Sequence, residues 1–186
     1  MNFRRWDYFG PLGAKTLMIA LAVSFSCACF AQSLRLDSAG VRASFYSSGA
    51  GGDFHQAEGF VNWDLPWDWD LGSLWHLGSR LEASAGWLGE SGADAAIFSG
   101  GPSLWLNHGQ FPLSLEGGVS PTVLTRSDFR TKDFGVPFQF TSHVGLNLDI
   151  ASKVRLSYRF QHMSNAGLSN RNPGLNLHMF GVSYLF

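Results

Sequence analysis

The chain has 186 residues, and its 13 basic and 14 acidic side chains give a formal net charge of −1. It has no basic stripe and no run of like charges, which excludes nucleic-acid binding as an expected function. The 22 glycines and 16 phenylalanines, in a chain with two cysteines, are typical of an all-β barrel. We expect a single folded domain.

The N-terminal segment has the three parts of a secretory signal peptide. A basic flank precedes the apolar run 16–30, and small residues lead to a cleavage point after Ala31. The run is too short for a membrane-spanning helix, which needs about 20 residues. We therefore expect a signal peptide over residues 1–31 and a mature domain over residues 32–186. Both cysteines lie in the leader, so the mature domain has no disulfide.

The mature region alternates apolar and polar residues with a period of two, which is typical of β-strands. Turns rich in Gly, Asn, Asp and Ser separate the alternating runs. No segment after residue 31 has 18 consecutive apolar residues. The pattern predicts eight strands, roughly at residues 34–48, 54–69, 74–90, 95–107, 112–126, 134–150, 153–165 and 175–186.

The polar faces of these strands carry many charges. The charged residues are Arg80, Glu82, Glu116, Asp149, Arg155 and Arg159. A soluble barrel would turn them to water and pack the apolar faces inside. A membrane barrel inverts this arrangement, with apolar side chains toward lipid and a charged network inside.

Two further features favour the membrane barrel. The chain ends on an alternation that stops at Phe186, which resembles the signature that bacterial outer-membrane barrels present to the barrel-assembly machinery. Tryptophans cluster around the second turn, as in an aromatic girdle, at positions 63, 67, 69 and 75. We expect an eight-stranded antiparallel transmembrane β-barrel in the bacterial outer membrane, with a lumen just filled by side chains. A lipocalin-like soluble barrel with a Trp-rich core is the alternative.

The seventh predicted strand ends in a histidine and a serine. With an even number of strands both termini are periplasmic, so the loop after this strand is extracellular. His162 lies nine residues after Lys153, which is about 20 Å of height in an apolar band of about 25 Å. Parity places His162 and Ser164 on the lipid-facing side, and Asn176 and His178 on the same face of the last strand. Polar residues facing lipid are costly unless they serve a function.

These residue types suit acyl-ester hydrolysis. Serine is a poor nucleophile until a base takes its proton, and histidine is the usual base, oriented by a third group. Side chains at i and i+2 of a strand share a face at about 6–7 Å between Cα atoms. The Gly and Asn residues after Ser164 can aim N–H donors at an oxyanion. An interfacial histidine beside a polar loop would give the same short motif, so the motif alone leaves both interpretations open.

A longer string is more specific. The stretch from His162 to Gly167, followed four residues later by Asn172-Pro-Gly, resembles the signature of the lipid A 3-O-deacylases of the PagL type. The segment 67–70 before Ser73 is similar to that family's turn between the second and third strands. The resemblance implies an eight-stranded outer-membrane barrel that hydrolyses the acyl chain ester-linked at the 3-position of lipid A without a cofactor.

The resemblance also implies roles for individual residues. Ser164 matches the nucleophile and His162 the base of a Ser-His-acid triad on the lipid-facing wall. The oxyanion-hole region corresponds to Asn165, Ala166, Gly167 and Asn172.

The position of the triad acid departs from the family. The family has a Glu where this chain has Asn176. Asn can hold a histidine tautomer by accepting from Nδ1–H, but it cannot stabilise the imidazolium as a carboxylate does. The same change of Asp to Asn in a serine protease costs about 10⁴-fold in rate. The sequence therefore leaves open a slow enzyme that uses Asn176, another orienting group such as His178, or a relative that only binds.

We expect an outer-membrane serine esterase that removes the 3-O-linked acyl chain of lipid A by a Ser-His(-Asn) mechanism. The alternative is a non-enzymatic outer-membrane barrel, structural or binding, and a lipid A acyltransferase is a third option. The expected partners are lipid A or lipopolysaccharide of the outer leaflet, membrane lipids and the barrel-assembly machinery, and a homodimer is compatible with the sequence. The other histidines have no metal-like spacing, so we expect no metal, and the resemblance implies that no cofactor is needed.

Overall fold

The computed structural model describes residues 34–48 and 53–186. The expected signal peptide and its cleavage point lie outside the described residues. The chain divides into two compact units, Met1–Leu34 and Arg35–Phe186, and the second unit is the barrel described below. Within the described ranges, no helix is long and apolar enough to cross a membrane.

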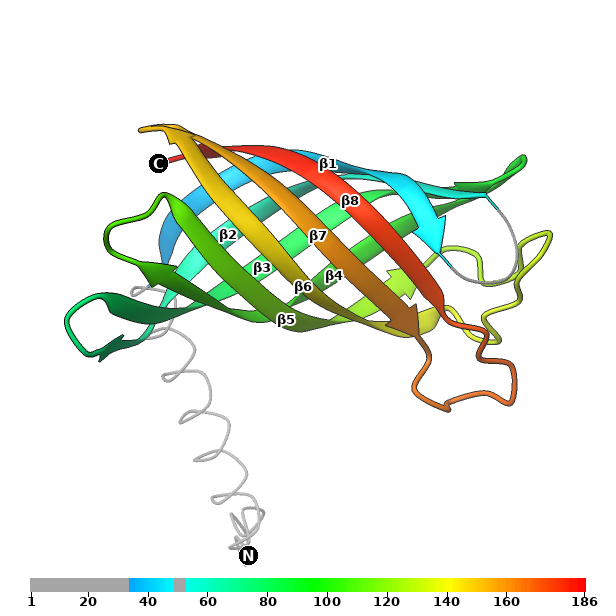
Figure 1. Ribbon diagram of the computed structural model, residues 1–186. Helices are drawn as coiled ribbons and strands as arrows, with labels where there is room; N and C mark the ends of the chain where they lie inside the picture. The colour runs from blue at the N-terminus through cyan, green and yellow to red at the C-terminus, as the bar shows by residue number, and fades with distance from the viewer. Residues whose placement is uncertain (1–33, 49–52) are drawn as a thin grey trace, which may run out of the picture. The chain divides into compact units, whose positions relative to one another are not determined.

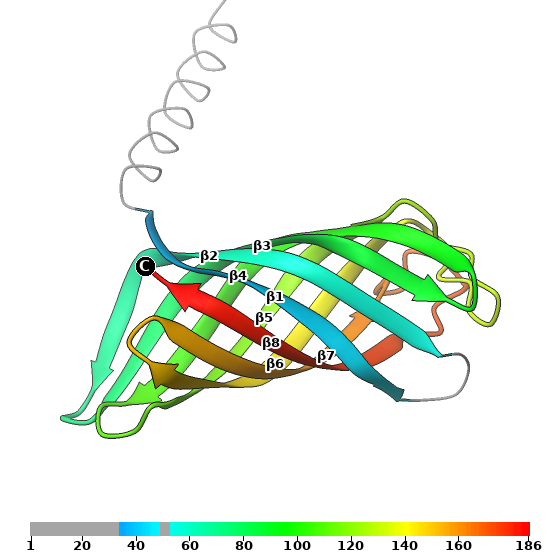
Figure 2. The same cartoon turned by 90° about the horizontal axis from the view of Figure 1, so that it is seen from above.

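Eight strands form a closed antiparallel barrel in which each strand pairs with its neighbours in sequence and β8 closes onto β1 (Figures 1 and 2). The predicted fold class is confirmed. The strands are β1 (Arg35–Ser48), β2 (Phe54–Leu71), β3 (Trp75–Glu90), β4 (Ala93–His108), β5 (Leu113–Leu124), β6 (Phe138–Ala151), β7 (Val154–Ser164) and β8 (Leu175–Leu185).

The largest difference from the predicted boundaries is at β6, which begins at Phe138 and not at residue 134. Gly135 has a φ of 77°, outside the extended region, and Pro137 has no N–H to give to a ladder. The loop 125–137 is therefore longer than the sequence predicted. At the β3–β4 turn, Ser91 and Gly92 both have positive φ, 45° and 87°, as a two-residue type I′ hairpin requires.

The two ends of the barrel differ. The C-terminus lies at the end with the short turns β2–β3, β4–β5 and β6–β7, while the loops 125–137 and 165–174 lie side by side at the other end (Figures 1 and 2). Outer-membrane barrels have short periplasmic turns and longer extracellular loops. The loops 125–137 and 165–174 are therefore at the extracellular end.

Side chains alternate as the sequence predicted, with the apolar face outward. In β6 the buried residues are Gln139, Thr141, His143 and Asn147, and the exposed apolar residues are Phe138, Phe140, Val144, Leu146, Leu148 and Ile150. Such an outward apolar face is suited to lipid. Trp67, Trp69 and Trp75 are exposed near the short-turn end, where an interfacial girdle would lie.

The middle of the lumen holds the predicted charged network. Glu82 accepts two hydrogen bonds from Arg42, at 3.0 and 2.6 Å, and two from Arg159, at 2.9 and 2.8 Å. Arg159 also donates to Glu116 at 2.7 Å, and Arg42 pairs with Glu58. The cavity left among these groups is only about 10 Å³, so side chains fill this level of the barrel.

The extracellular end of the lumen is apolar, which the sequence did not predict. Phe129 and Phe134 of loop 125–137 fold back into the barrel and contact Phe54, with ring centroids 5.3 and 6.0 Å from its ring. The buried cluster around them includes Leu88, Ile97, Leu124, Met163, Leu175, Leu177 and Met179. This apolar cluster anchors loop 125–137 beside the start of β8.

Candidate active site

The predicted His, Ser and Asn residues lie together at the extracellular end of β7 and β8. His162 pairs directly with Asn176 across the two strands, and Ser164 is the last residue of β7. All three are half-buried, while the alternate residues Met163 and Leu175 are buried in the lumen. The three polar groups therefore share the outer, lipid-facing side, as parity predicted.

A hydrogen bond joins His162 and Asn176, with 2.6 Å between the imidazole Nδ1 and Oδ1. An amide oxygen can only accept, so this contact requires the proton on Nδ1 and leaves Nε2 with a free lone pair. Nε2 is then the basic nitrogen of the ring. Asn176 thus contacts the ring nitrogen that an orienting group would contact.

The Ser164 hydroxyl and the His162 ring make no hydrogen bond to one another within the described chain. They are two residues apart on one face of a strand, which is about 6–7 Å between Cα atoms. Hydrogen bonds of a catalytic group are often long without substrate and tighten in the complex.

A second serine lies beside the histidine and was missed by the sequence reasoning. Ser142 of β6 pairs directly with His162 and is exposed on the same outer face. Its flanking residues are in the β6 ladder, so their amides pair with β5 and β7. Ser164 differs because a loop with irregular backbone follows it, and such a loop can direct amides at a bound ester.

His178, the other orienting group considered from the sequence, has different partners. Its Nδ1 is 2.8 Å from the Tyr158 hydroxyl, and its ring packs on Phe160 at 5.0 Å between centroids. Across β7 and β8 it pairs with Phe160 and not with His162. Asn176 is therefore the residue that contacts Nδ1 of His162.

Asn165 organises the loop after Ser164. Its side chain is fully buried, at 0% exposure, and its Nδ2 donates to the carbonyls of Phe134 at 2.9 Å and Arg171 at 2.7 Å. Its Oδ1 accepts from the Gly167 N–H at 2.9 Å, and its own N–H donates to Oδ1 of Asn172 at 3.0 Å. The amides of Asn165 and Gly167 are therefore already engaged in shaping the loop.

Two residues of the predicted oxyanion region keep free donors. Within residues 34–48 and 53–186, the Ala166 N–H and both the N–H and the Nδ2 of Asn172 have no hydrogen-bond partner. Ala166 has a φ of 52°, a left-handed conformation that costs energy for a residue with a Cβ. Backbone strain of this kind clusters at sites that bind ligands. The sequence grouped four residues in this region, and the geometry leaves Ala166 and Asn172 with free donors.

Loop 125–137 contributes a contact that the sequence reasoning missed. The Lys132 ammonium donates to the Gly174 carbonyl at 3.0 Å. Gly174 has a φ of 64°, and a Cβ built on it would be only 3.1 Å from Cε1 of His162. Two loops from different hairpins therefore meet at Gly174, next to the imidazole. No local pattern signals this contact, because it depends on how the two loops fold onto one another.

A second tie between these loops is ionic. Asp133 pairs with Arg171, and it accepts from the Gly135 N–H at 2.8 Å. The Gly135 hydrogen bond and the Arg171 guanidinium favour the carboxylate, and they lower the pKa of Asp133 below its ordinary value of 3.8.

The remaining histidines are scattered, as the sequence indicated. His76 lies 2.9 Å from a carboxylate oxygen of Asp70, and His143 lies 3.8 Å from one of Glu116. In the part of the chain that the structure describes, no three or more His, Cys, Asp or Glu residues are grouped to hold a metal ion.

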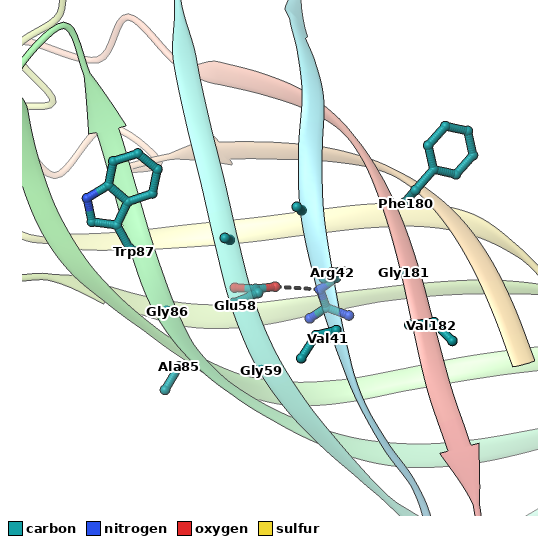
Figure 3. A pocket seen from close by; sticks show the side chains of 12 residues that line it. Val41, Arg42, Glu58, Gly59, Ala85, Gly86, Trp87, Phe180, Gly181 and Val182 are labelled. Carbon is teal, nitrogen blue, oxygen red and sulfur yellow. Dashed lines mark hydrogen bonds and ion pairs between the residues drawn. The ribbon is translucent and has the colours of Figure 1, made fainter. Parts of the chain in front are cut away.

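The outer wall near the site is hollowed in two places. One hollow, of about 440 Å³, lies on β6–β8 and is lined by Leu146, Leu148, Leu156, Tyr158 and Phe180. The other, of about 740 Å³, crosses β8, β1, β2 and β3. Figure 3 shows Trp87 and Phe180 standing on its two sides, with the Arg42–Glu58 pair between them. Phe180 separates the two hollows.

Fold and site define a class of protein: a small transmembrane β-barrel with a His, a Ser and an Asn on its lipid-facing wall at the extracellular end. The sequence model described as lipid A 3-O-deacylase (PagL) matches residues 55–185, which is more than half of the chain. The chain belongs to the lipid A 3-O-deacylase (PagL) family. It is thus an outer-membrane β-barrel of a hydrolase family.

Two relatives can be compared in detail. Lipid A deacylase PagL of Bordetella bronchiseptica is 36% identical over 72 residues, which span 39% of this chain and only 40% of that protein. The crystal structure of the outer membrane enzyme PagL has a TM-score of 0.67 at 19% identity, over 79% of this chain and 97% of that chain. The structural likeness confirms the barrel fold.

Proposed function

We propose that the protein is a serine esterase of the outer membrane that hydrolyses the acyl chain ester-linked at the 3-position of lipid A. One observation carries the proposal beyond family membership. His162 donates from Nδ1 to Asn176 at 2.6 Å on the lipid-facing wall, two residues from Ser164. In this arrangement the lone pair of the ring is on Nε2, on the same outer face of β7 as the Ser164 hydroxyl, at the height where acyl esters of outer-leaflet lipids would lie.

In the first half-reaction, Nε2 of His162 takes the hydroxyl proton as Oγ of Ser164 attacks the ester carbonyl carbon. The Ala166 N–H and the Asn172 Nδ2 donate to the oxyanion that forms. Collapse of this intermediate breaks the bond between the acyl carbon and the sugar 3-oxygen. The sugar oxygen receives the proton from Nε2, and the acyl group remains on Ser164.

In the second half-reaction, water replaces the sugar. His162 takes a proton from the water as its oxygen attacks the acyl carbon, and the same donors hold the second oxyanion. Collapse releases the fatty acid and returns the proton to Ser164. Asn176 keeps the proton on Nδ1 throughout, but as a neutral group it gives no charge stabilisation to the imidazolium. We therefore expect slow turnover.

The hollow on β6–β8 is the natural place for the acyl chain of the reacting ester. Its lining is apolar and it lies on the same outer face, toward the membrane centre from the site. Lipid tails are already as apolar as leucine, so moving a chain from the bilayer to this wall has little hydrophobic driving force. The hollow therefore acts through shape, and we expect it to select chain length more than to raise affinity.

The C-terminal strand supports the barrel-assembly machinery as a partner. Phe180, Val182, Tyr184 and Phe186 alternate on the outer face and are exposed. The sequence signature for assembly is thus accessible along the edge where β8 pairs with β1.

The test is mass spectrometry of lipid A from cells that express the wild type, Ser164→Ala or Ser142→Ala. We expect the wild type and Ser142→Ala to remove one hydroxyacyl mass, and Ser164→Ala to leave lipid A intact. Ser142 is the matched control because it is the other serine beside His162. Loss of activity in Ser142→Ala alone would reassign the nucleophile. Unmodified lipid A in all three would support a barrel that binds without catalysis, and an added mass would indicate acyl transfer.

A further inference from the structure

Lys132 is a buried cation in loop 125–137. Its residue exposure is 9%, and no carboxylate of the described residues forms an ion pair with it. Among the described residues, the one hydrogen-bond partner of its ammonium is the Gly174 carbonyl, 3.0 Å from Nζ. Lysine is almost never buried without a partner, because removing an ammonium from water is costly. This contact therefore ties loop 125–137 to the carbonyl of Gly174.

Gly174 is in contact with the catalytic histidine proposed above. A Cβ at this position would lie 3.1 Å from Cε1 and 3.8 Å from Nε2 of His162, so the backbone itself packs on the ring. Gly174 also directly precedes β8, two residues before Asn176. The position of this one peptide therefore affects both the face of the imidazole and the group that accepts from its Nδ1.

The backbone that carries Lys132 is itself held on both sides. The Thr131 N–H donates to the buried Glu90 carboxylate at 3.0 Å, and the Phe129 N–H donates to the Lys132 carbonyl at 2.8 Å. On the other side, Phe134 is fully buried in the apolar cluster, and its carbonyl accepts from Asn165. The Lys132 ammonium thus extends from a backbone that hydrogen bonds and apolar packing hold in place.

We propose that Lys132 is a positioning residue of the hydrolytic site, which holds Gly174 against His162 and keeps Asn176 in register. The inference rests on the proposed esterase function and deepens it. A neutral Asn orients the ring through one hydrogen bond, without the charge attraction that a carboxylate adds. The geometry of the His162–Asn176 pair therefore depends more on the backbone that presents Asn176, and Lys132 restrains that backbone.

The first test uses the folded, full barrel in detergent with a short-chain water-soluble ester. Lys132→Met keeps the apolar part of the side chain at nearly its full length and removes the ammonium, and Lys132→Arg keeps a cationic donor. Arg130→Met is the matched control, because it removes a cation two residues away that donates to the Ser91 carbonyl at 3.2 Å. We expect kcat to fall about 10- to 100-fold in Lys132→Met at unchanged KM, since misplacement by about 1 Å can cost 10²-fold.

Lys132→Arg should recover part of that kcat, and Arg130→Met should match the wild type. A folded Lys132→Met protein with wild-type kcat would refute the proposal. So would a normal rate on the soluble ester with a raised KM on lipid A, because that result would make Lys132 a binding group for the lipid headgroup.

A second pair of variants perturbs the same contact from the other side. Gly174→Ala places a methyl 3.1 Å from the His162 ring at a φ of 64°, whereas Gly72→Ala has a similar φ of 82° with open space around it. We expect Gly174→Ala to lose kcat and Gly72→Ala to keep it. Combining Lys132→Met with Gly174→Ala should lower kcat no further than the worse single variant, because both act through one contact. If the fold-decreases in kcat of the two single variants multiply in the double variant, Lys132 and Gly174 do not act through the same contact.

A readout without catalysis separates this inference from the esterase proposal. In NMR spectra of histidine-labelled protein, the Nδ1–H proton bonded to Asn176 should give a protected downfield signal in the wild type and in Arg130→Met. In Lys132→Met it should broaden through exchange with water. An unchanged signal refutes the positioning role even if the wild type hydrolyses lipid A. Loss of the signal in Lys132→Met supports the positioning role even if the wild type proves inactive.

Discussion

Asn176→Asp should accelerate hydrolysis, because it places a carboxylate where the amide oxygen now contacts His162. Asp has the size of Asn, so its oxygen can occupy the position 2.6 Å from Nδ1. Glu, which the sequence resemblance gives to the family at this position, is one methylene longer than Asn. Asp is therefore the replacement that changes charge without changing geometry.

The magnitude follows from the separation of the charges. An Nδ1–O contact of 2.6 Å puts the centres of the imidazolium and the carboxylate about 4 Å apart, where their attraction is about 1 kcal/mol in water and about 4 kcal/mol at an effective dielectric constant near 20. Each 1.36 kcal/mol is tenfold in rate. The half-buried site lies between these limits, so we expect kcat to rise between about 5-fold and 10³-fold, within the ~10⁴-fold effect of the acid in serine proteases.

The assay is kcat on a soluble ester as a function of pH, with the folded state of each barrel checked by its migration in unheated gels. Asn176→Leu is the control of similar size, and it should be slower than the wild type because Nδ1–H loses its acceptor. The acid limb of the Asn176→Asp profile should also move to higher pH, because the carboxylate favours the protonated ring. Equal kcat in Asn176→Asp and the wild type, in folded protein, would refute the orienting role of this residue.

Two further predictions concern stability and pH. Glu82→Gln removes the carboxylate that both Arg42 and Arg159 contact. Breaking a buried pair in this way should lower the free energy of unfolding by about 3–5 kcal/mol. Urea unfolding in lipid vesicles should show this decrease for Glu82→Gln and no decrease for the control Asp70→Asn, which changes an exposed residue. The Gly135 N–H and Arg171 lower the pKa of Asp133 below its ordinary value of 3.8. The ionised carboxylate therefore stabilises the folded protein fully above pH 3.8, and this stabilisation is lost as the pH falls through the lower pKa of the folded state. The Gly135 amide resonance should therefore titrate below pH 3.8, and a midpoint at or above that value would contradict the assignment.

The alternation of apolar and polar side chains can be predicted from the amino-acid sequence alone, because the period of two is a local property of an extended chain. It identified eight strands, the inward charges Glu82 and Arg159, and the outward face of His162 and Ser164. The β6 boundary was wrong by four residues, since the φ of Gly135 is set by loop packing and not by pattern.

Tertiary packing decided what the pattern could not show. The register of the β6–β7 hairpin places Ser142 opposite His162, and this register depends on the turn between the strands and not on the alternation of side chains. Folding of loop 125–137 onto loop 165–174 buries Asn165 and brings Lys132 to Gly174. The sequence by itself determined which face carries the polar group. Only the tertiary structure decided what holds that group in place, because those contacts join loops of two neighbouring hairpins, β5–β6 and β7–β8, that fold onto one another in the complete barrel.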